Sequence, residues 1–422
     1  MNVLILSWEY PPIVAGGLAR HVRKLSENLV DDAELEIHVL TRGARDTPEY
    51  ELWPEAKIRS QTAGPDAPRR TSPNGVHVHR VPETSHPKDL DAFLKWVDRM
   101  NADMVTVGRE LAEAADLVHG HDWLVADAAD RLARHAGVPY LTTIHATEYG
   151  RHQGWVDKHP QSYIHAAETW MAQRADHVIT CSHYMRGHVA DVYDLDEDRI
   201  SVIPNGIDPE DLQPHAPQDL LALRAQFAAP EDKLVLLVGR LVYEKGFQLA
   251  LDALPGLIRR LGNVRYLVAG SGTHEAELKR QAQRLGIAEH GTFLGWIGDD
   301  VLHSLYRIAD LTVVPSIYEP FGLVALEAMA SGCPCIVADT GGLREVVPNR
   351  DVGLRFKTQS ARSLSHWVAR VLTDEQLRDQ LVAEASEHVL RFDWADIAVQ
   401  TAEVYRRIAT ERPAPAAEPA TR

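Results

Sequence analysis

The sequence predicts two α/β domains, each built on a doubly wound parallel sheet. Three observations lead to this prediction: short apolar runs without alternation, a helical stretch after each of them, and a restart of the pattern midway along the chain. Unalternating apolar runs are typical of parallel strands that are buried on both faces. Because such strands alternate with amphipathic helices, the expected architecture is the doubly wound sheet.

Ten apolar runs supply the expected strands. They are 3–6, 36–41, 116–121, 139–145 and 177–182 in the first half, and 233–240, 265–270, 291–296, 311–316 and 333–339 in the second. The segment 204–220 between the two sets is rich in proline, aspartate and glycine and has little apolar periodicity. These are the properties of an interdomain linker, so we place the domain boundary near residue 210.

Other parts of the chain complete this organisation. The first domain spans 1–210, and its polar, proline-rich segment 43–75 is longer than an ordinary connection and is expected to be a flexible insert. The second domain spans 211–390, and a helix is expected over 391–410. Residues 411–422, "ERPAPAAEPATR", have the composition of a disordered tail.

Composition and charge exclude several classes of protein. The 422 residues include 44 basic and 60 acidic side chains, a formal net charge of -16, so no overall field attracts nucleic acid or anionic lipid. No stretch approaches the about 18 apolar residues that cross a bilayer, and the N-terminus has no basic leader. The three cysteines have neither zinc-ligand nor redox-pair spacing, so we expect a cytoplasmic location.

Polar residues follow several of the expected strands. In open parallel sheets ligands bind beyond the carboxyl ends of the strands, where loops and helix N-termini converge. The residues at these positions are Glu9, Asp122, Trp123 and His145 in the first domain, and Arg240, Lys245 and Glu319 in the second. If the two edges face each other, they form a cleft lined with acidic, basic and imidazole groups.

Two segments have the residues of a phosphate site. Gly16 and Gly17 lie at the start of the first helix, where free N–H groups and the helix dipole favour an anion, although a plain turn would also explain them. Arg240 and Lys245 lie just beyond a strand, between glycines, and could clamp a diphosphate. The alternative for this second pair is a solvated loop.

The segment "YEPFGLVALEAM" (318–329) has two acids in a mostly apolar run. A helix that begins at about Gly322 leaves the N–H groups of residues 321–323 as free donors. It places Glu319 in the preceding loop and Glu327 in the second turn, so both carboxylates could line one elongated ligand. The alternative is that Glu319 caps the helix electrostatically and that Glu327 pairs with a lysine.

Two other classes of site are disfavoured. The segments "HGHD" (119–122) and "HATE" (145–148) could together suggest zinc, but they have no nearby cysteine and no helical His-Glu-x-x-His, so no metal is expected. The acidic segment "DLDED" (194–198) is better explained as a polar loop. A dehydrogenase is also disfavoured, because neither half has Gly-x-Gly-x-x-Gly after its first strand.

Taken together, four segments resemble one family. They are "GG" (16–17), "PNGID" (204–208), "GRLVYEKG" (239–246) and "YEPFGLVALEAMASGCPCIVADTGGLREVV" (318–347), and they are similar to those of the family 4 retaining glycosyltransferases of the GT-B fold. The resemblance covers the chain apart from 43–75 and the tail. It implies two facing Rossmann-like domains with a cleft between them, an acceptor site in the first, a nucleotide-sugar site in the second, and a last helix that returns to the first.

The resemblance also implies a role for individual residues. Arg240 and Lys245 would hold the donor phosphates, with Gly16 and Gly17 beside them, and Glu327 would bind the ribose hydroxyls. The carboxylate of Glu319 and the N–H groups of Phe321, Gly322 and Leu323 would bind the sugar and the distal phosphate, and His145 would lie near O6 of the sugar and the reacting carbon. No metal is implied, because two cations and a helix N-terminus can stabilise the leaving diphosphate.

A narrower resemblance concerns the acceptor. The segments "HGHDWLVAD" (119–127) and "TTIHATEYGRHQGW" (142–155) look like those of bacterial glycogen synthases and related α-1,4-glucosyltransferases, which would place Glu9, Asp122 and Trp123 on the acceptor side. Those synthases have a lysine where this chain has Val14. The base of the donor nucleotide therefore stays open.

The leading hypothesis is a retaining glucosyltransferase that extends an α-1,4-glucan from ADP-glucose or UDP-glucose. No carboxylate is an obvious nucleophile, so attack from the leaving-group face is expected. One alternative is a lipid or small-molecule acceptor, suggested by the basic amphipathic segment 18–25, which could lie on an anionic bilayer. A noncatalytic sugar-binding protein is the remote alternative. The expected partners are a nucleotide sugar and a glucan or oligosaccharide, and the oligomeric state stays open.

Overall fold

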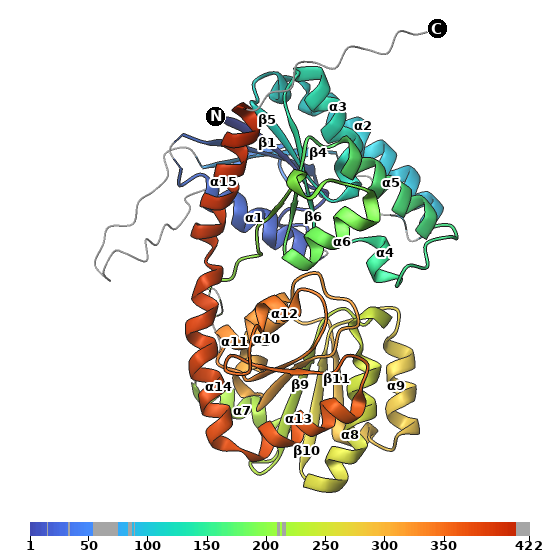
Figure 1. The fold of residues 1–422 in the computed structure, drawn as a ribbon, viewed down its shortest axis with the longest axis vertical. Coiled ribbons are helices and arrows are strands. Elements are labelled where there is room, and N and C mark those ends of the chain that lie inside the picture. Colours follow the sequence, from blue (N-terminus) through green and yellow to red (C-terminus); the bar gives the residue numbers. More distant parts are fainter. Residues whose placement is uncertain are drawn as a thin grey trace, which may run out of the picture. The chain divides into compact units, whose positions relative to one another are not determined.

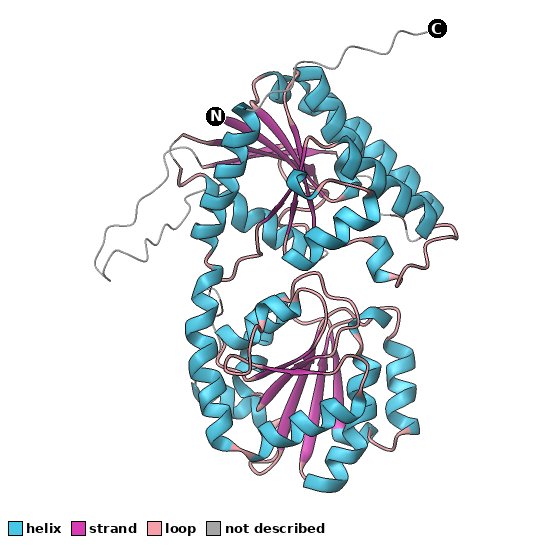
Figure 2. Ribbon diagram, in the orientation of Figure 1, coloured by secondary structure: helices cyan, strands magenta, loops and turns pink. Residues whose placement is uncertain are grey.

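The computed structural model describes residues 1–53, 75–82, 87, 89–208, 212 and 217–410, apart from Ala15 and Ala33. The chain divides into two compact units. Unit 1 combines Met1–Gly206 with the segment that starts at Trp394, and unit 2 spans Ile207–Asp393. In each unit the strands form a central layer with helices on both faces (Figures 1 and 2). The boundary predicted near residue 210 lies among residues that the structure does not describe.

Unit 1 contains an eight-stranded sheet in the order β3-β4-β2-β1-β5-β6-β7-β8. The strands are β1 (Asn2–Leu6), β2 (Glu36–Arg42), β3 (Tyr50–Trp53), β4 (Val76–Val81), β5 (Leu117–His121), β6 (Tyr140–Ile144), β7 (His177–Thr180) and β8 (Ile200–Val202). The pairings are parallel except that between β3 and β4. The strand order reverses between β1 and β5, which is the topological switch point of a doubly wound sheet.

Helices cover both faces of this sheet. One face carries α1 (Gly17–Leu29) and α15 (Trp394–Thr410), and the other carries α2 (Leu90–Glu113), α3 (Ala126–Ala136) and α5 (Gln161–Arg174) (Figure 1). The short α4 (Glu148–Arg151) and α6 (His183–Tyr193) complete the unit. One apolar cluster joins β1, β2 and β4 to α1 and α15. The C-terminal helix is therefore part of the core of unit 1.

Unit 2 contains a six-stranded parallel sheet in the order β11-β10-β9-β12-β13-β14. The strands are β9 (Lys233–Val238), β10 (Val264–Ala269), β11 (Gly291–Gly295), β12 (Leu311–Val314), β13 (Cys335–Ala338) and β14 (Leu354–Phe356). The helices are α7 (Pro217–Ala225), α8 (Phe247–Leu261), α9 (Glu275–Arg284), α10 (Asp299–Ile308), α11 (Leu323–Ala330), α12 (Leu343–Val346), α13 (Ala361–Thr373) and α14 (Glu375–His388). The strand order reverses between β9 and β12.

The ten predicted strands are all present, and the prediction of two doubly wound α/β domains is confirmed. The prediction of a flexible insert over 43–75 is wrong for part of that segment, because β3 at 50–53 pairs with β4 at the sheet edge. Residues 54–74 and the predicted tail 411–422 lie outside the described residues. The last helix begins at Trp394, after the 3-10 turn η5 (Val389–Phe392), rather than at residue 391.

The structure also bears on membrane contact. No helix in the described part of the chain is both long and apolar enough to span a bilayer. The apolar side of α1, which includes Val22, Leu25 and Leu29, is buried in the core of unit 1. A helix that lies on a bilayer must present its apolar side to lipid. The basic segment 18–25 therefore does not provide the membrane surface that its sequence allowed.

Candidate active site

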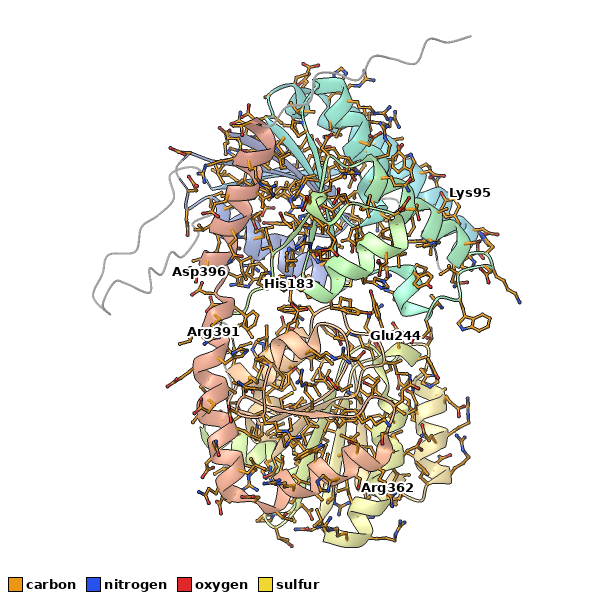
Figure 3. All side chains as sticks on the ribbon, viewed as in Figure 1. Lys95, His183, Glu244, Arg362, Arg391 and Asp396 are labelled. Carbon is orange, nitrogen blue, oxygen red and sulfur yellow. The ribbon has the colours of Figure 1, made fainter. Side chains whose placement is uncertain are left out.

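The predicted donor residues of unit 2 lie beyond two neighbouring strands, β9 and β12, at the switch point of the sheet. The 3-10 turn η3 (Tyr243–Lys245) follows β9, and the loop that contains Glu319 follows β12. Backbone contacts join the two loops, since the N–H of Ile317 donates to the carbonyl of Glu244 at 2.8 Å. Glu244 is labelled in Figure 3. The segments 239–246 and 318–329 are therefore brought together at the carboxyl edge of the sheet, where ligands bind in open parallel sheets.

Gly246 lets these loops approach closely. Its φ is +69°, a conformation that side chains rarely adopt, and an added Cβ would lie 2.0 Å from the carbonyl oxygen of Pro315. A residue other than glycine would therefore push the two loops apart. This contact fixes the position of Lys245, which directly precedes Gly246, against the loop after β12.

Lys245 and Glu319 form the centre of this site. The ammonium of Lys245 lies 2.8 Å from Oε2 of Glu319, and the hydroxyl of Ser316 donates to the same oxygen at 2.9 Å. The two side chains are 21% and 11% exposed, so the pair is partly screened from water. The arrangement places a cation and an anion side by side at the carboxyl edge of the sheet.

Arg240 is the second predicted cation. Its side chain is 59% exposed, and its Nη2 lies 3.9 Å from Oε1 of Glu244. A contact of that length between an exposed guanidinium and a carboxylate holds the side chain weakly. The guanidinium lies at the surface, just beyond the end of β9.

The second acid of the motif has a different environment. Helix α11 begins at Leu323, one residue later than expected, and its N-cap Gly322 has φ +124° with no side-chain cap. The hydroxyl of Tyr306 on α10 donates to Oε2 of Glu327 at 2.8 Å. Burial and the charge of Glu327 raise the pKa of Tyr306 well above its usual value, so the phenol keeps its proton. The described contacts of Glu319 are with Lys245 and Ser316, and that of Glu327 is with Tyr306.

In unit 1, the predicted glycine pair lies at the start of α1. Gly17 is its first residue and Gly16 is its N-cap, with the extended φ of -165°. The N–H of Gly16 donates to Oε2 of Glu9 at 3.2 Å. Glu9 is only 2% exposed, so this carboxylate acts as an internal anion at the helix N-terminus. Its predicted contact with an acceptor stays a prediction.

Asp122 and His145 meet beyond β5 and β6. The backbone N–H of His145 donates to Oδ1 of Asp122 at 2.9 Å. Burial raises the pKa of Asp122 to about 6 and, with the charge of Arg151, lowers that of His145 to about 4, so the imidazole is neutral at pH 7. Trp123 begins the adjacent 3-10 turn η1 (Trp123–Val125) and is half-buried.

Other histidines surround His145. Nδ1 of His121 lies 3.1 Å from Nε2 of His145, and the ring centroid of His21 lies 4.6 Å from that of His145. Nδ1 of His21 and Nε2 of His121 are buried without a hydrogen-bond partner in the described structure. His21 was not predicted because it lies on α1, away from the strand ends in the sequence. Ser316 and Tyr306 were not predicted because only the fold brings them to Glu319 and Glu327. The sequence itself has no signal for these three.

The sequence is similar to those of known glycosyltransferases along almost its whole length. A family model described as "Glycosyltransferase Family 4" matches residues 15–211, and one described as "Glycosyl transferases group 1" matches 222–388. An uncharacterized glycosyltransferase of Methanocaldococcus jannaschii is 34% identical, over 96% of this chain and 98% of that protein. A protein named glycogen synthase of Mycobacterium tuberculosis is 35% identical, over 96% and 94%.

Two further proteins are informative. A D-inositol 3-phosphate glycosyltransferase of Acidothermus cellulolyticus is 30% identical, over 94% of this chain and 87% of that protein. The solved structure of sucrose-phosphate synthase from Thermosynechococcus elongatus superposes with a TM-score of 0.77 at 25% identity, over 97% of this chain and 99% of that chain. The chain therefore belongs to the family 4 glycosyltransferases and has their GT-B fold of two Rossmann-like domains.

Proposed function

We propose that this glycosyltransferase transfers glucose, with retention of configuration, from ADP-glucose or UDP-glucose to the non-reducing end of an α-1,4-glucan. The observation that carries the proposal is the contact between Lys245 and Glu319 at the switch point of unit 2. It unites a phosphate-binding cation with a sugar-binding acid on one sheet edge. The glucan acceptor is supported by the 35% identity to a protein named glycogen synthase.

The donor site stabilises the leaving group. When the bond between the anomeric carbon and the phosphate oxygen breaks, negative charge develops on the nucleoside diphosphate. Arg240, Lys245 and the N–H groups that precede α11 offer positive charge and hydrogen bonds to that phosphate, which is electrostatic stabilisation without a metal. Glu327, oriented by Tyr306, accepts hydrogen bonds from the ribose hydroxyls.

Retention follows from attack on the face that the diphosphate leaves. The acceptor oxygen bonds to the anomeric carbon as the bond between that carbon and the phosphate oxygen breaks. The proton of the acceptor hydroxyl passes to the same phosphate oxygen. His145 contributes as a neutral hydrogen-bonding group near the sugar, because its lowered pKa of about 4 keeps it uncharged at pH 7. Glu9, Asp122 and Trp123 contribute to the acceptor side of unit 1.

A direct assay tests this function. The purified chain is incubated with malto-oligosaccharide and either ADP-glucose or UDP-glucose, with and without a chelator. We expect longer oligosaccharides, one nucleoside diphosphate released per glucose added, and the same rate with chelator. Absence of turnover with every glucan tested would refute the acceptor, and loss of turnover in chelator would refute the metal-independent mechanism.

A second acceptor class deserves the same assay, because a relative named D-inositol 3-phosphate glycosyltransferase is 30% identical over 94% of this chain. In this alternative the acceptor is a small sugar phosphate or polyol phosphate. Competition between malto-oligosaccharide and such phosphates for one donor separates the two. Product formation only on the phosphorylated acceptor would replace the glucan proposal while leaving the donor site as described.

A further inference from the structure

A cluster of histidines lies on unit 1 away from the proposed transfer site. Two groups of three potential metal ligands occur in the described residues: His21, His121 and His145 in the interior, and Glu36, His38 and His77 on the neighbouring strands β2 and β4. The interior group has no carboxylate and includes His145, which the proposed function uses. The group on β2 and β4 is partly exposed and takes no part in that function.

We propose that Glu36, His38 and His77 form a binding site for a divalent transition-metal ion, with Zn²⁺ as the expected occupant. Imidazole nitrogens together with one carboxylate are ligands that Zn²⁺ accepts, whereas Mg²⁺ and Ca²⁺ prefer oxygen ligands. This inference does not rest on the proposed function.

The sheet itself generates the site. Glu36 and His38 are two residues apart on β2, so their side chains lie on the same face of the strand. On the neighbouring parallel strand β4, His77 is the register partner of His38. The three side chains are 44%, 21% and 23% exposed, in that order, so an ion can reach them from solvent.

The distances suit a tetrahedral ion. Oε1 of Glu36 lies 3.2 Å from Nε2 of His38 and 3.9 Å from Nε2 of His77. Zinc bonds of about 2.0–2.2 Å in a tetrahedron separate neighbouring ligand atoms by about 3.3–3.5 Å. Small rotations of the side chains therefore produce three bonds, with a fourth position open to water.

The outer nitrogen of each histidine is already oriented. Nδ1 of His38 lies 3.1 Å from Nε2 of His79, and Nδ1 of His77 lies 2.9 Å from the hydroxyl of Tyr50 on β3. If each Nδ1 carries the proton and donates it to these partners, each Nε2 lone pair is left for the metal. Partners of this kind fix the tautomer and the ring orientation of metal-binding histidines.

The position in the sheet separates this site from glycosyl transfer. Glu36 and His77 lie at the amino ends of β2 and β4, whereas Glu9 and Asp122 follow the carboxyl ends of β1 and β5. Because ligands for chemistry bind at the carboxyl edge of such sheets, a metal here would join β2 to β4 rather than act on substrate. Metal binding should therefore stabilise unit 1.

Calorimetric titration of the untagged, chelator-treated chain with Zn²⁺ tests the proposal. We expect one ion per chain and a raised melting temperature. His77→Gln should abolish that binding, and Tyr50→Phe should weaken it about 10-fold, the size expected for loss of an outer partner. His135→Gln is the matched control, because its Nε2 also lies beside one carboxylate, Glu113, at 2.9 Å, and it should bind as the wild type does.

Co²⁺ provides an independent readout, since its visible spectrum reports coordination geometry. Tetrahedral bands in the wild type that are absent in His77→Gln would support the site, provided that the metal-free variant has the circular dichroism spectrum and melting temperature of the wild type. Zn²⁺ affinity unchanged in His77→Gln would overturn the proposal. Binding lost in His145→Gln but retained in His77→Gln would also overturn it, by assigning the ion to the interior histidines.

Discussion

Replacement of Lys245 by alanine tests the proposed donor site most directly. Its ammonium lies 2.8 Å from Oε2 of Glu319, at the edge where two loops converge. If this charge stabilises the leaving diphosphate, its loss should lower kcat/KM by about 10²–10³-fold, the effect of removing one preorganised electrostatic contact, or about 3–4 kcal/mol of transition-state stabilisation.

The same substitution should have a modest effect on stability. Exposed ion pairs contribute up to about 1 kcal/mol, and breaking a fully buried pair costs about 3–5 kcal/mol. With side chains 21% and 11% exposed, this pair lies between those limits. Ser316 still donates to Glu319 after the change. We therefore expect the free energy of unfolding of unit 2 to fall by about 1–3 kcal/mol, measured by urea titration.

The control is Lys279→Ala, which removes a lysine 2.7 Å from Glu275 on α9, where the side chains are 51% and 28% exposed. Since Lys279 also lies 5.6 Å from the ring centroid of Phe293, this change should lower the free energy of unfolding by about 1 kcal/mol or less, and it should leave turnover unchanged. The double variant Lys245→Ala/Glu319→Ala should recover part of the lost stability and none of the activity, because it removes the unpaired carboxylate. Near-native release of nucleoside diphosphate by Lys245→Ala would refute our role for this residue.

The remaining predictions concern neighbouring features. Tyr306→Phe removes the hydrogen bond to Glu327. Because a hydrogen bond to a charged group contributes about 1.5 kcal/mol, this change should raise the KM for the donor about 10-fold with little change in kcat. An unchanged KM would contradict this role of Tyr306. Gly322→Ala should destabilise the chain by about 1–3 kcal/mol, because φ at Gly322 is +124° and the added Cβ would lie 2.6 Å from the side chain of Leu343. The control is Gly187→Ala within α6, where an added Cβ meets nothing within 4 Å, and it should stabilise the chain by about 0.5–1 kcal/mol. Glu168 is a buried residue of α5, and burial raises its pKa from 4.5 to about 7. Its contribution to stability is therefore fully present below pH 4.5 and is lost as the pH rises through 7. From pH 5 to pH 8 the wild type should therefore lose about 2–3 kcal/mol relative to Glu168→Gln in urea titrations, and parallel pH profiles would contradict the shift.

Much of the fold could be predicted because its strands are buried on both faces. Segments such as β1 and β9 are continuous apolar runs. In a chain where such runs alternate with helices, they are typical of parallel strands buried on both faces. The predicted placement of Lys245 and Glu319 at one sheet edge followed from the same geometry, since parallel strands gather the residues after their carboxyl ends. Neither residue alone would have identified the site.

Four strands escaped prediction for physical reasons. The described β8 and β14 have only three residues each, too few for a periodic signal. The strand β4 has polar residues at His77, His79 and Arg80 and therefore no continuous apolar run, and the short β3 lies in a polar segment. The motifs Glu-x-His (36–38) and His-x-His (77–79) were visible in the sequence, yet only the pairing of β2 with β4 brings Glu36, His38 and His77 together.

The contacts between the two loops of the proposed donor site indicate how a substitution there should act. The loop after β9 and the loop after β12 are joined by the backbone bond between Ile317 and Glu244, by the close approach at Gly246, and by the ion pair of Lys245 with Glu319. The first two contacts involve only backbone, so they persist when a side chain is removed. Loss of Lys245 should therefore leave the remaining groups in place and remove one charge. For that reason the expected loss of activity measures electrostatic stabilisation of the leaving group rather than disorder of the loop.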